Sequence, residues 1–239
     1  MRSTSLYNRY VIIVAGGSGS RMGSTLPKQF IEVANKPILL HTIERFHAYS
    51  SDIQIILALP KDQFTYWYTL AERFYSLIHS FTHSLIVTEG GATRFQSVRN
   101  GLSCIEGDGL VAIHDGVRPF VTPAIIANSF DTAAARGTAV VSVLVKDSVR
   151  VLLENHQSQA LDRSRIRLVQ TPQTFQVSLI KKAFETEELP SFTDDASVAE
   201  HAGFAIHLID GAYENIKITT PEDLVWAEAY CNTSLRSES

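Results

Sequence analysis

The stretch from Gly16 to Lys28 combines glycines with two cations, a composition suited to binding a polyphosphate. Glycines stand at positions 16, 17, 19 and 23, and Arg21 and Lys28 lie among and just beyond them. Glycine lets a ligand approach main-chain N–H groups closely, and successive N–H groups form a concave anion site. Pro27 fixes the backbone just before Lys28. These residue types and their spacing predict a phosphate cradle.

The spacing of this loop differs from two common phosphate-binding fingerprints. It does not follow the G-x-G-x-x-G pattern of dinucleotide-binding proteins, and no glycine stands five residues before a Gly-Lys-Ser/Thr sequence. A glycine-rich turn with solvated charges is the alternative interpretation. The arginine, the lysine and the proline favour the cradle.

Four further segments carry side chains suited to a nucleotide and a sugar phosphate, at residues 89–97, 114–119, 162–163 and 214–221. The first places two glycines and a serine before a helix, which suits recognition of a base or ribose. Asp115 with Arg118 could hold ribose or Mg²⁺, or form a surface ion pair of little energetic value. Arg163 alone would be a solvated charge. Lys217 lies in an apolar, strand-like run, where a lysine needs a partner such as phosphate.

Short apolar runs predict the sheet that positions these segments. They lie at residues 10–15, 53–59, 84–88, 110–114 and 139–145, with helix-like stretches between them, including 62–80. This alternation predicts an α/β fold with a doubly wound, mostly parallel, twisted sheet. Ligands in such sheets bind outside the carboxyl ends of the strands. The candidate segments follow predicted strands, so topology and chemistry agree.

Residues 146–170 interrupt this alternation. Strand-like runs at 148–153 and 165–169 flank a polar connection and predict a projecting β-hairpin arm. Because an isolated two-stranded hairpin is marginally stable in water, we expect the arm to pack on something else, such as a second subunit. Helices are predicted at 177–188, 194–201 and 221–230, with a strand at 204–209. No linker divides the chain, which predicts one domain over residues 1–239.

Composition narrows the class of protein. The net charge of −4 argues against a nucleic-acid-binding protein. No apolar run approaches the length of about 18 residues that a membrane span requires. The first ten residues lack the apolar core of a secretory signal. We therefore expect a cytoplasmic protein that meets anionic ligands with a local cluster of cations.

Taken together, the loop and these segments resemble a known family. The stretch AGGSGSRMGSTLPKQF resembles the G-x-G-x-R-M-x(n)-P-K signature of sugar-nucleotide pyrophosphorylases, and in particular the 2-C-methyl-D-erythritol 4-phosphate cytidylyltransferase family. Further matching motifs are GGATR, HDGVRP, LDRSRIRLVQTPQTF, FTDDAS and ENIKITTPEDL, so the resemblance runs from about residue 10 to residue 230. It implies a Rossmann-like nucleotidyltransferase domain. The implied activity is cytidylyl transfer from CTP to methylerythritol phosphate, with release of pyrophosphate, in non-mevalonate isoprenoid precursor synthesis.

The resemblance also implies roles for individual residues. Arg21 and Lys28 would stabilise charge on the α-phosphate, while Arg163 and Lys217 would hold the methylerythritol phosphate. Residues expected to help hold that acceptor are Asp115, Arg118 and Thr193. The CTP site would be lined by Ala15, Gly16, Gly17, Gly91, Ser97 and Gly116, and further substrate-binding positions are Arg94 and Ser148. Two departures stand out: Ala92 replaces a commonly acidic residue, and Ser148 replaces a frequent threonine while keeping its hydroxyl.

The same resemblance implies a cofactor and a partner. Mg²⁺ would be bound mainly through the CTP phosphates, with no metal site made by the protein itself. A homodimer would form through the arm, residues 146–170. Two alternatives remain open at this point: a ribitol-5-phosphate cytidylyltransferase, which shares several of the motifs, and a non-catalytic nucleotide-binding protein on the same fold. The TDDASVAEHAG segment and the Asp162–Arg163 pair favour the methylerythritol enzyme, and the four cations favour catalysis.

Overall fold

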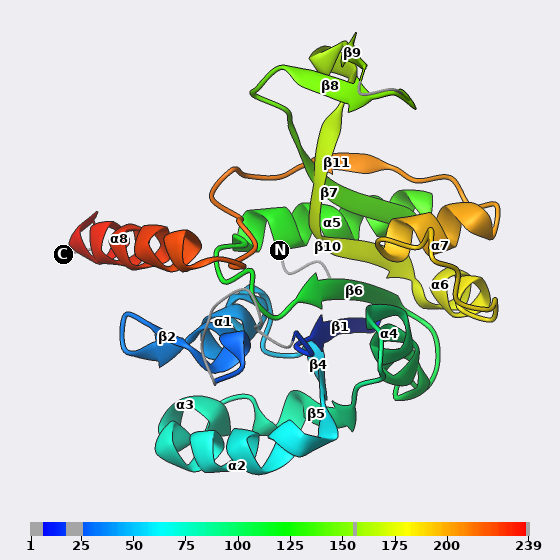
Figure 1. Cartoon of the computed structure of the whole chain (residues 1–239). Helices are drawn as coiled ribbons and strands as arrows, with labels where there is room; N and C mark the ends of the chain where they lie inside the picture. Colours follow the sequence, from blue (N-terminus) through cyan, green and yellow to red (C-terminus); the bar gives the residue numbers. More distant parts are fainter. Residues whose placement is uncertain (1–6, 18–25, 155–156, 238–239) are drawn as a thin grey trace.

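A seven-stranded sheet forms the centre of the molecule, in a computed structural model that describes residues 7–17, 26–154 and 157–237 (Figure 1). In spatial order its strands are β11 (Leu208–Asp210), β7 (Thr138–Leu144), β10 (Arg167–Gln176), β6 (Leu110–Asp115), β1 (Arg9–Val14), β4 (Gln54–Leu59) and β5 (Leu85–Glu89). Four neighbouring pairs are parallel: β11 with β7, β6 with β1, β1 with β4, and β4 with β5. Strand β10 runs antiparallel to both of its neighbours, β6 and β7. The predicted mostly parallel sheet is confirmed.

Helices cover both faces of this sheet, because successive side chains of each strand point to opposite faces. In β1, Val11 and Ile13 pack in one core with α1 (Ile38–Tyr49), α2 (Phe64–Arg73) and α5 (Pro123–Arg136). Tyr10 and Ile12 pack in the other with α4 (Arg94–Ser103), α6 (Val177–Ala183) and α7 (Asp195–His201). The predicted doubly wound arrangement is therefore confirmed.

Shorter elements complete the described chain. A two-stranded ribbon joins β2 (Glu32–Val33) to β3 (Lys36–Pro37), and short helices are α3 (Tyr75–His79), η2 (Lys28–Phe30), η3 (Lys61–Gln63), η4 (Thr82–Ser84) and η6 (Arg163–Arg165). The last helix, α8 (Pro221–Ser237), extends to the left in Figure 1. It buries Ala227 in a small third core with Val33, Ile38 and Phe120. Within the described residues, no helix is both long enough and apolar enough to span a bilayer.

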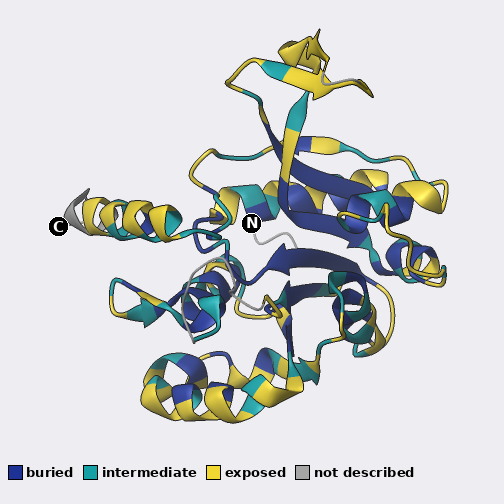
Figure 2. Cartoon of the chain, in the orientation of Figure 1, coloured by how far each residue is buried: buried dark blue, intermediate teal, exposed yellow. Residues whose placement is uncertain are grey.

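The arm is present, but one of its predicted strands is wrong. It pairs β8 (Val149–Leu152) with β9 (Ser158–Leu161), and it projects at the top of Figure 1, where its residues are mostly exposed (Figure 2). The run 165–169, predicted as its second strand, instead leads into β10, where Arg167–Val169 pair with β7. A proline within a polar run argues against a central strand, and β10 accommodates Pro172 through a shift of register between Val169 and Gln173.

Several other boundaries also differ from prediction. The helix predicted over 62–80 is divided into η3, α2 and α3, and α6 ends at Ala183 rather than at 188. The strand predicted over 204–209 is the shorter β11. The run around Lys217 is a connection between β11 and α8 rather than a strand, and it is fixed by hydrogen bonds such as the 2.9 Å bond from Ile218 N to Val117 O.

Candidate functional site

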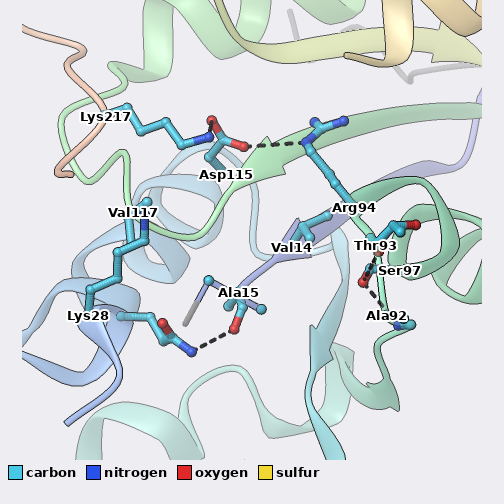
Figure 3. Close-up of a pocket in the computed structure, with 14 residues that line it drawn as sticks. Val14, Ala15, Lys28, Ala92, Thr93, Arg94, Ser97, Asp115, Val117 and Lys217 are labelled. Atoms are coloured by element: carbon cyan, nitrogen blue, oxygen red, sulfur yellow. Dashed lines mark hydrogen bonds and ion pairs between the residues drawn. The ribbon is translucent and has the colours of Figure 1, made fainter. Parts of the chain in front are cut away.

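A cavity of about 270 Å³ lies at the carboxyl ends of β1 and β6 and beside the first turn of α4 (Figure 3). This is the edge of the sheet at which an α/β fold binds its ligands. We call it the first cavity, and its lining residues are Val14, Ala15, Gly16, Gly17, Lys28, Gln29, Gly91, Ala92, Thr93, Arg94, Ser97, Asp115, Val117 and Lys217.

A second cavity of about 220 Å³ adjoins the first. The two share three charged residues, Arg94, Asp115 and Lys217. The second cavity is completed by residues from β10, from the loop after β6 and from the segment before α7: Arg118, Val169, Gln170, Thr171, Gln173, Thr193 and Asp194. The shared charges therefore stand between two compartments.

Asp115, the last residue of β6, is the centre of this shared group. Its carboxylate is buried, and Oδ2 lies 3.1 Å from Arg118 Nε and 3.2 Å from Lys217 Nζ. Arg94 Nε lies 3.6 Å from Oδ1, and Figure 3 shows Lys217 and Arg94 approaching Asp115 from opposite sides. Burial alone would raise the pKa of Asp115, but Lys217, Arg94 and Arg118 hold it well below its usual range. Asp115 therefore stays ionised and holds three cations together.

Lys28 enters the first cavity from η2, which is anchored to the sheet by its neighbour. The buried Gln29 donates from Nε2 to Ala15 O at 2.7 Å, just beyond the end of β1. A Cβ on Gly17 would lie 2.7 Å from Lys28 Cε. The glycine therefore leaves the space that the lysine side chain occupies.

The segment 90–93, which we call the strap, is bound to the first turn of α4. Gly91 N donates to Ser97 Oγ at 3.0 Å, and Ala92 N donates to Gln96 Oε1 at 3.1 Å. Thr93 is the N-cap of α4, and its hydroxyl accepts from Gln96 N at 3.1 Å. These bonds present a strap of main chain and small side chains to the first cavity.

The structure brings many of the sequence-predicted residues together. Those lining the first cavity are Ala15, Gly16, Gly17, Lys28, Gly91, Arg94, Ser97, Asp115 and Lys217, and those found in the second are Arg94, Asp115, Arg118, Thr193 and Lys217. Gly116 is not among the lining residues but packs against one of them, because a Cβ on Gly116 would lie 2.9 Å from Ala15 Cβ.

Two predicted residues lie away from both cavities. Ser148 and Arg163 are exposed on and beside the arm, and neither is among the described residues that line the two cavities. Arg163 Nη1 donates to Lys146 O at 2.7 Å. Arg21 lies outside the described residues.

Sequence reasoning missed several buried polar residues of the site. Gln29 lines the first cavity, and Thr171 and Gln173 of β10 line the second. Asp195, 1% exposed, forms a two-point ion pair with Arg94. The available signal was their position inside the motif strings PKQF, TPQTF and FTDDAS, where polar side chains interrupt or adjoin apolar ones.

The described residues offer few free carboxylates to a metal ion, so they suit a metal ion that arrives bound to a ligand better than one that the protein binds directly. No group of three or more His, Cys, Asp or Glu side chains within the described ranges is arranged to hold a metal ion. Asp115, the carboxylate nearest both cavities, already faces three cations. A Mg²⁺ ion would therefore need phosphate oxygens as its main ligands.

Comparison with known proteins gives a consistent set of matches. Residues 10–233 match the model of the family described as IspD, 2-C-methyl-D-erythritol 4-phosphate cytidylyltransferase. A protein of that name from Bacteroides fragilis is 48% identical over 221 residues, which cover 92% of this chain and 98% of the relative. Another from Bacteroides thetaiotaomicron is 49% identical over 214 residues, covering 90% and 95%.

Solved structures with the same architecture carry related names. The 4-diphosphocytidyl-2C-methyl-D-erythritol synthase from Anaerococcus prevotii matches with a TM-score of 0.79 and 27% identity, covering 95% of this chain and 96% of that one. The 2-C-methyl-D-erythritol 4-phosphate cytidylyltransferase from Thermus thermophilus matches with a TM-score of 0.72 and 28% identity, covering 94% and 99%.

Proposed function

Because the chain belongs to the 2-C-methyl-D-erythritol 4-phosphate cytidylyltransferase family, we propose that the first cavity binds CTP and the second binds 2-C-methyl-D-erythritol 4-phosphate. The enzyme is a nucleotidyltransferase. It transfers the cytidylyl group from CTP to the acceptor phosphate and yields CDP-methylerythritol and pyrophosphate, a step in isoprenoid precursor synthesis. We expect the enzyme to act in the cytoplasm, where CTP is available to it.

One observation carries the assignment of the two cavities: they adjoin and share Arg94, Asp115 and Lys217. Nucleotidyl transfer brings two anions into contact, so the reaction needs cations at the boundary between them. Around Asp115 stand Arg94, Arg118 and Lys217, which outnumber that carboxylate. Asp195 compensates the charge of Arg94, so Arg118 and Lys217 are the cations that bring positive charge to the place where the two phosphates would meet.

We assign roles to individual residues from their place in these cavities. Lys28 would neutralise charge that develops on the α-phosphate and on the departing pyrophosphate, together with Arg21. Lys217 would hold the acceptor phosphate in line with the α-phosphate, with Arg118 and Thr193 on the acceptor side. The glycines of the loop and the strap would admit the nucleotide to main-chain N–H groups. Such a mechanism requires no covalent intermediate on the protein.

The proposal includes Mg²⁺ held mainly by the triphosphate of CTP. When bound, Mg²⁺ would neutralise charge on the triphosphate and make pyrophosphate a better leaving group. The protein side of this arrangement is the set of cations already named, which share the neutralisation of charge with the metal ion.

We further propose that residues 1–239 form one nucleotidyltransferase domain and that residues 146–170 dimerise it. The arm exposes Leu152, which is 81% accessible, together with Val151 and Leu161. A two-stranded hairpin with exposed apolar side chains gains stability only by packing on another surface. A second copy of this chain is the proposed surface, and the Arg163 and Ser148 of one copy would complete the second cavity of the other.

Pyrophosphate release tests the function. Purified protein is supplied with CTP and Mg²⁺, and with one polyol phosphate at a time. We expect 2-C-methyl-D-erythritol 4-phosphate to support turnover far better than ribitol 5-phosphate, and CTP to be preferred over UTP and ATP. Equal or reversed preference between the two acceptors would contradict the assigned acceptor. Absence of turnover with every polyol phosphate would contradict catalysis itself.

A further inference from the structure

Arg94 stands between the two cavities, and both terminal nitrogens of its guanidinium are held by one buried carboxylate. Nη1 lies 2.8 Å from Asp195 Oδ1, and Nη2 lies 2.6 Å from Asp195 Oδ2. Asp195 is 1% exposed and is not among the described residues that line either cavity. A two-point pair of this kind fixes orientation as well as distance. Arg94 is therefore held in place by a residue that no ligand in either cavity would touch.

On the side of the first cavity, Arg94 directly follows the strap. It is the first residue of α4, directly after the N-cap Thr93. Ser97 Oγ accepts from Gly91 N at 3.0 Å and donates to Thr93 O at 2.9 Å. The strap, the first turn of α4 and Arg94 consequently form one hydrogen-bonded unit at the wall of the first cavity.

On the acceptor side, Asp195 is built into the start of α7. Asp194 caps that helix, and the two residues before Asp195, Thr193 and Asp194, line the second cavity. Gln173 of β10 donates to Asp194 Oδ2 at 2.9 Å and accepts from Ala196 N at 2.8 Å. The position of Thr193 thus depends on the same turn that holds Arg94.

The charges of the pair strengthen this connection. Burial alone would lower the pKa of Arg94, but Asp195 and Asp115 raise it above its usual value. Burial raises the pKa of Asp195, and Arg94 opposes that rise. The two-point geometry identifies an ion pair, in which each charge is compensated only while the other stays in place. The pair therefore connects the start of α4 to the start of α7.

We propose that Asp195 is a positioning residue that couples the two cavities: through Arg94 it makes the acceptor cavity respond to nucleotide in the first. Binding of CTP would fix the strap, and the Arg94–Asp195 pair would transmit that ordering to Thr193 and Asp194. Coupling between two sites is reciprocal, so the acceptor must also tighten the binding of nucleotide. The identities of the two ligands rest on the proposed function; the coupling itself is a separate property.

Calorimetry with a non-hydrolysable CTP analogue tests the coupling. With the wild-type enzyme, we expect 2-C-methyl-D-erythritol 4-phosphate to bind about tenfold more tightly when the analogue is present, within the range usual for coupled sites. Asp195→Asn keeps the size of the side chain and loses the charge that holds Arg94. In this variant we expect the ratio of the acceptor affinities measured with and without the analogue to fall to about one. Each ligand alone should bind within about threefold of its wild-type affinity.

Glu188→Gln is the matched control. Glu188 is another acid on the connection between α6 and α7, and its Oε2 accepts from Gln96 Nε2 of α4 at 3.1 Å, at an exposed position. This variant should keep the tenfold ratio. If it lost the coupling as Asp195→Asn does, or if Asp195→Asn kept it, the pair would not be the connection.

Two further measurements separate coupling from folding. Should Asp195→Asn fail to fold, Arg94→Lys supplies the test, since it keeps the charge and loses the two-point fork; it should also lower the ratio. In steady state, an intact Asp195→Asn fold should show a raised KM for the acceptor at saturating CTP with kcat retained. A wild-type enzyme that turns over both substrates with a ratio of one would overturn the coupling alone, whereas one that binds neither ligand would overturn the proposed function.

Discussion

Asp115 is the residue on which both cavities depend, and its environment decides what it does. A carboxylate that faces Arg94, Arg118 and Lys217 has its pKa held low, after burial has acted in the opposite direction. A weakly basic carboxylate is a poor general base at neutral pH. Asp115 instead forms ion pairs with three cations at the boundary between the cavities.

His114 holds the backbone on either side of Asp115. Asp115 N donates to Thr171 Oγ1 at 3.1 Å, and Thr171 Oγ1 lies 3.0 Å from His114 Nδ1. His114 Nε2 lies 3.1 Å from Arg118 O. A carbonyl oxygen can only accept, so Nε2 carries the proton. Burial lowers the pKa of His114 to about 4, so the ring is neutral at pH 7 and Nδ1 then accepts from the Thr171 hydroxyl.

The neutral imidazole predicts how stability depends on pH. Burial lowers the pKa of His114 to about 4 from 6.5. The unfolded chain therefore binds the proton more tightly, and His114 destabilises the fold progressively as the pH falls from about 6.5 to about 4. Urea unfolding should show the wild type losing about 3 kcal/mol more than His114→Asn between pH 7 and pH 4. Equal losses in the two proteins would contradict a neutral, buried His114.

At the scale of residues, the charged side chains that line the cavities could be predicted from the sequence better than the buried residues that hold them in place. Lys28, Asp115, Arg118 and Lys217 were recognised because a cation or carboxylate after an apolar strand is conspicuous. Asp195 was not singled out, since one acid in a polar string has no visible partner until Arg94 is brought to it by the fold across a separation of 101 residues. Long-range pairing of polar side chains is a property of the topology, and spacing along the chain does not reveal it.

At the scale of elements, the turn after β1 is shaped to leave room for one lysine. A Cβ on Gly17 would lie 2.7 Å from Lys28 Cε and 3.4 Å from its Nζ. The neighbour is the far end of a flexible side chain, so the lysine would move while the fold persisted. The anchored backbone of η2, with Gln29 bonded to Ala15, would remain where it is.

Gly17→Ala should therefore reduce activity without reducing stability. Displacing a catalytic group by about an ångström can cost a factor of about 100 in rate. We expect kcat to fall by about 10- to 100-fold while the free energy of unfolding changes by less than about 0.5 kcal/mol. The control is the same substitution in a Lys28→Ala background, where it should add little. Additive losses in the double variant would show that Gly17 acts independently of the lysine.

Elements made of apolar runs were predicted well, and elements made of polar ones were not. The strands β1, β4, β6 and β7 were recognised because buried strands of a parallel sheet are continuously apolar, and the edge strand β5 was recognised from the short apolar run Leu85–Val87. Strand β10 was missed because it places Gln170, Thr171, Gln173 and Thr174 in the interior. Those side chains are satisfied by specific partners, such as Ser129 for Thr174 and Asp194 for Gln173. No local pattern announces a strand of this composition, and its first residues were consequently assigned to the arm.

At the scale of the whole molecule, one chain supplies two cavities and an arm that carries two further predicted site residues away from them. The arm buries little surface of its own, because nearly all residues of β8 and β9 are exposed. Exposed leucines and valines continue from the arm onto the start of β10, at Leu168 and Val169. A two-fold dimer makes any exchange of residues reciprocal, so each arm would serve the other subunit's acceptor cavity.

Complementation between inactive variants tests this exchange directly. Lys28→Ala removes a cation of the first cavity, and Arg163→Ala removes the arginine beside the arm; each variant alone should be nearly inactive. In a mixed dimer with exchanged arms, one site loses both residues and the other keeps both. If the two chains pair at random, about half of the dimers are mixed and one site in each works, so co-expression should restore about a quarter of wild-type activity. If Arg163 served its own subunit, every site would lack one residue, and mixed dimers verified by differential tags would remain inactive.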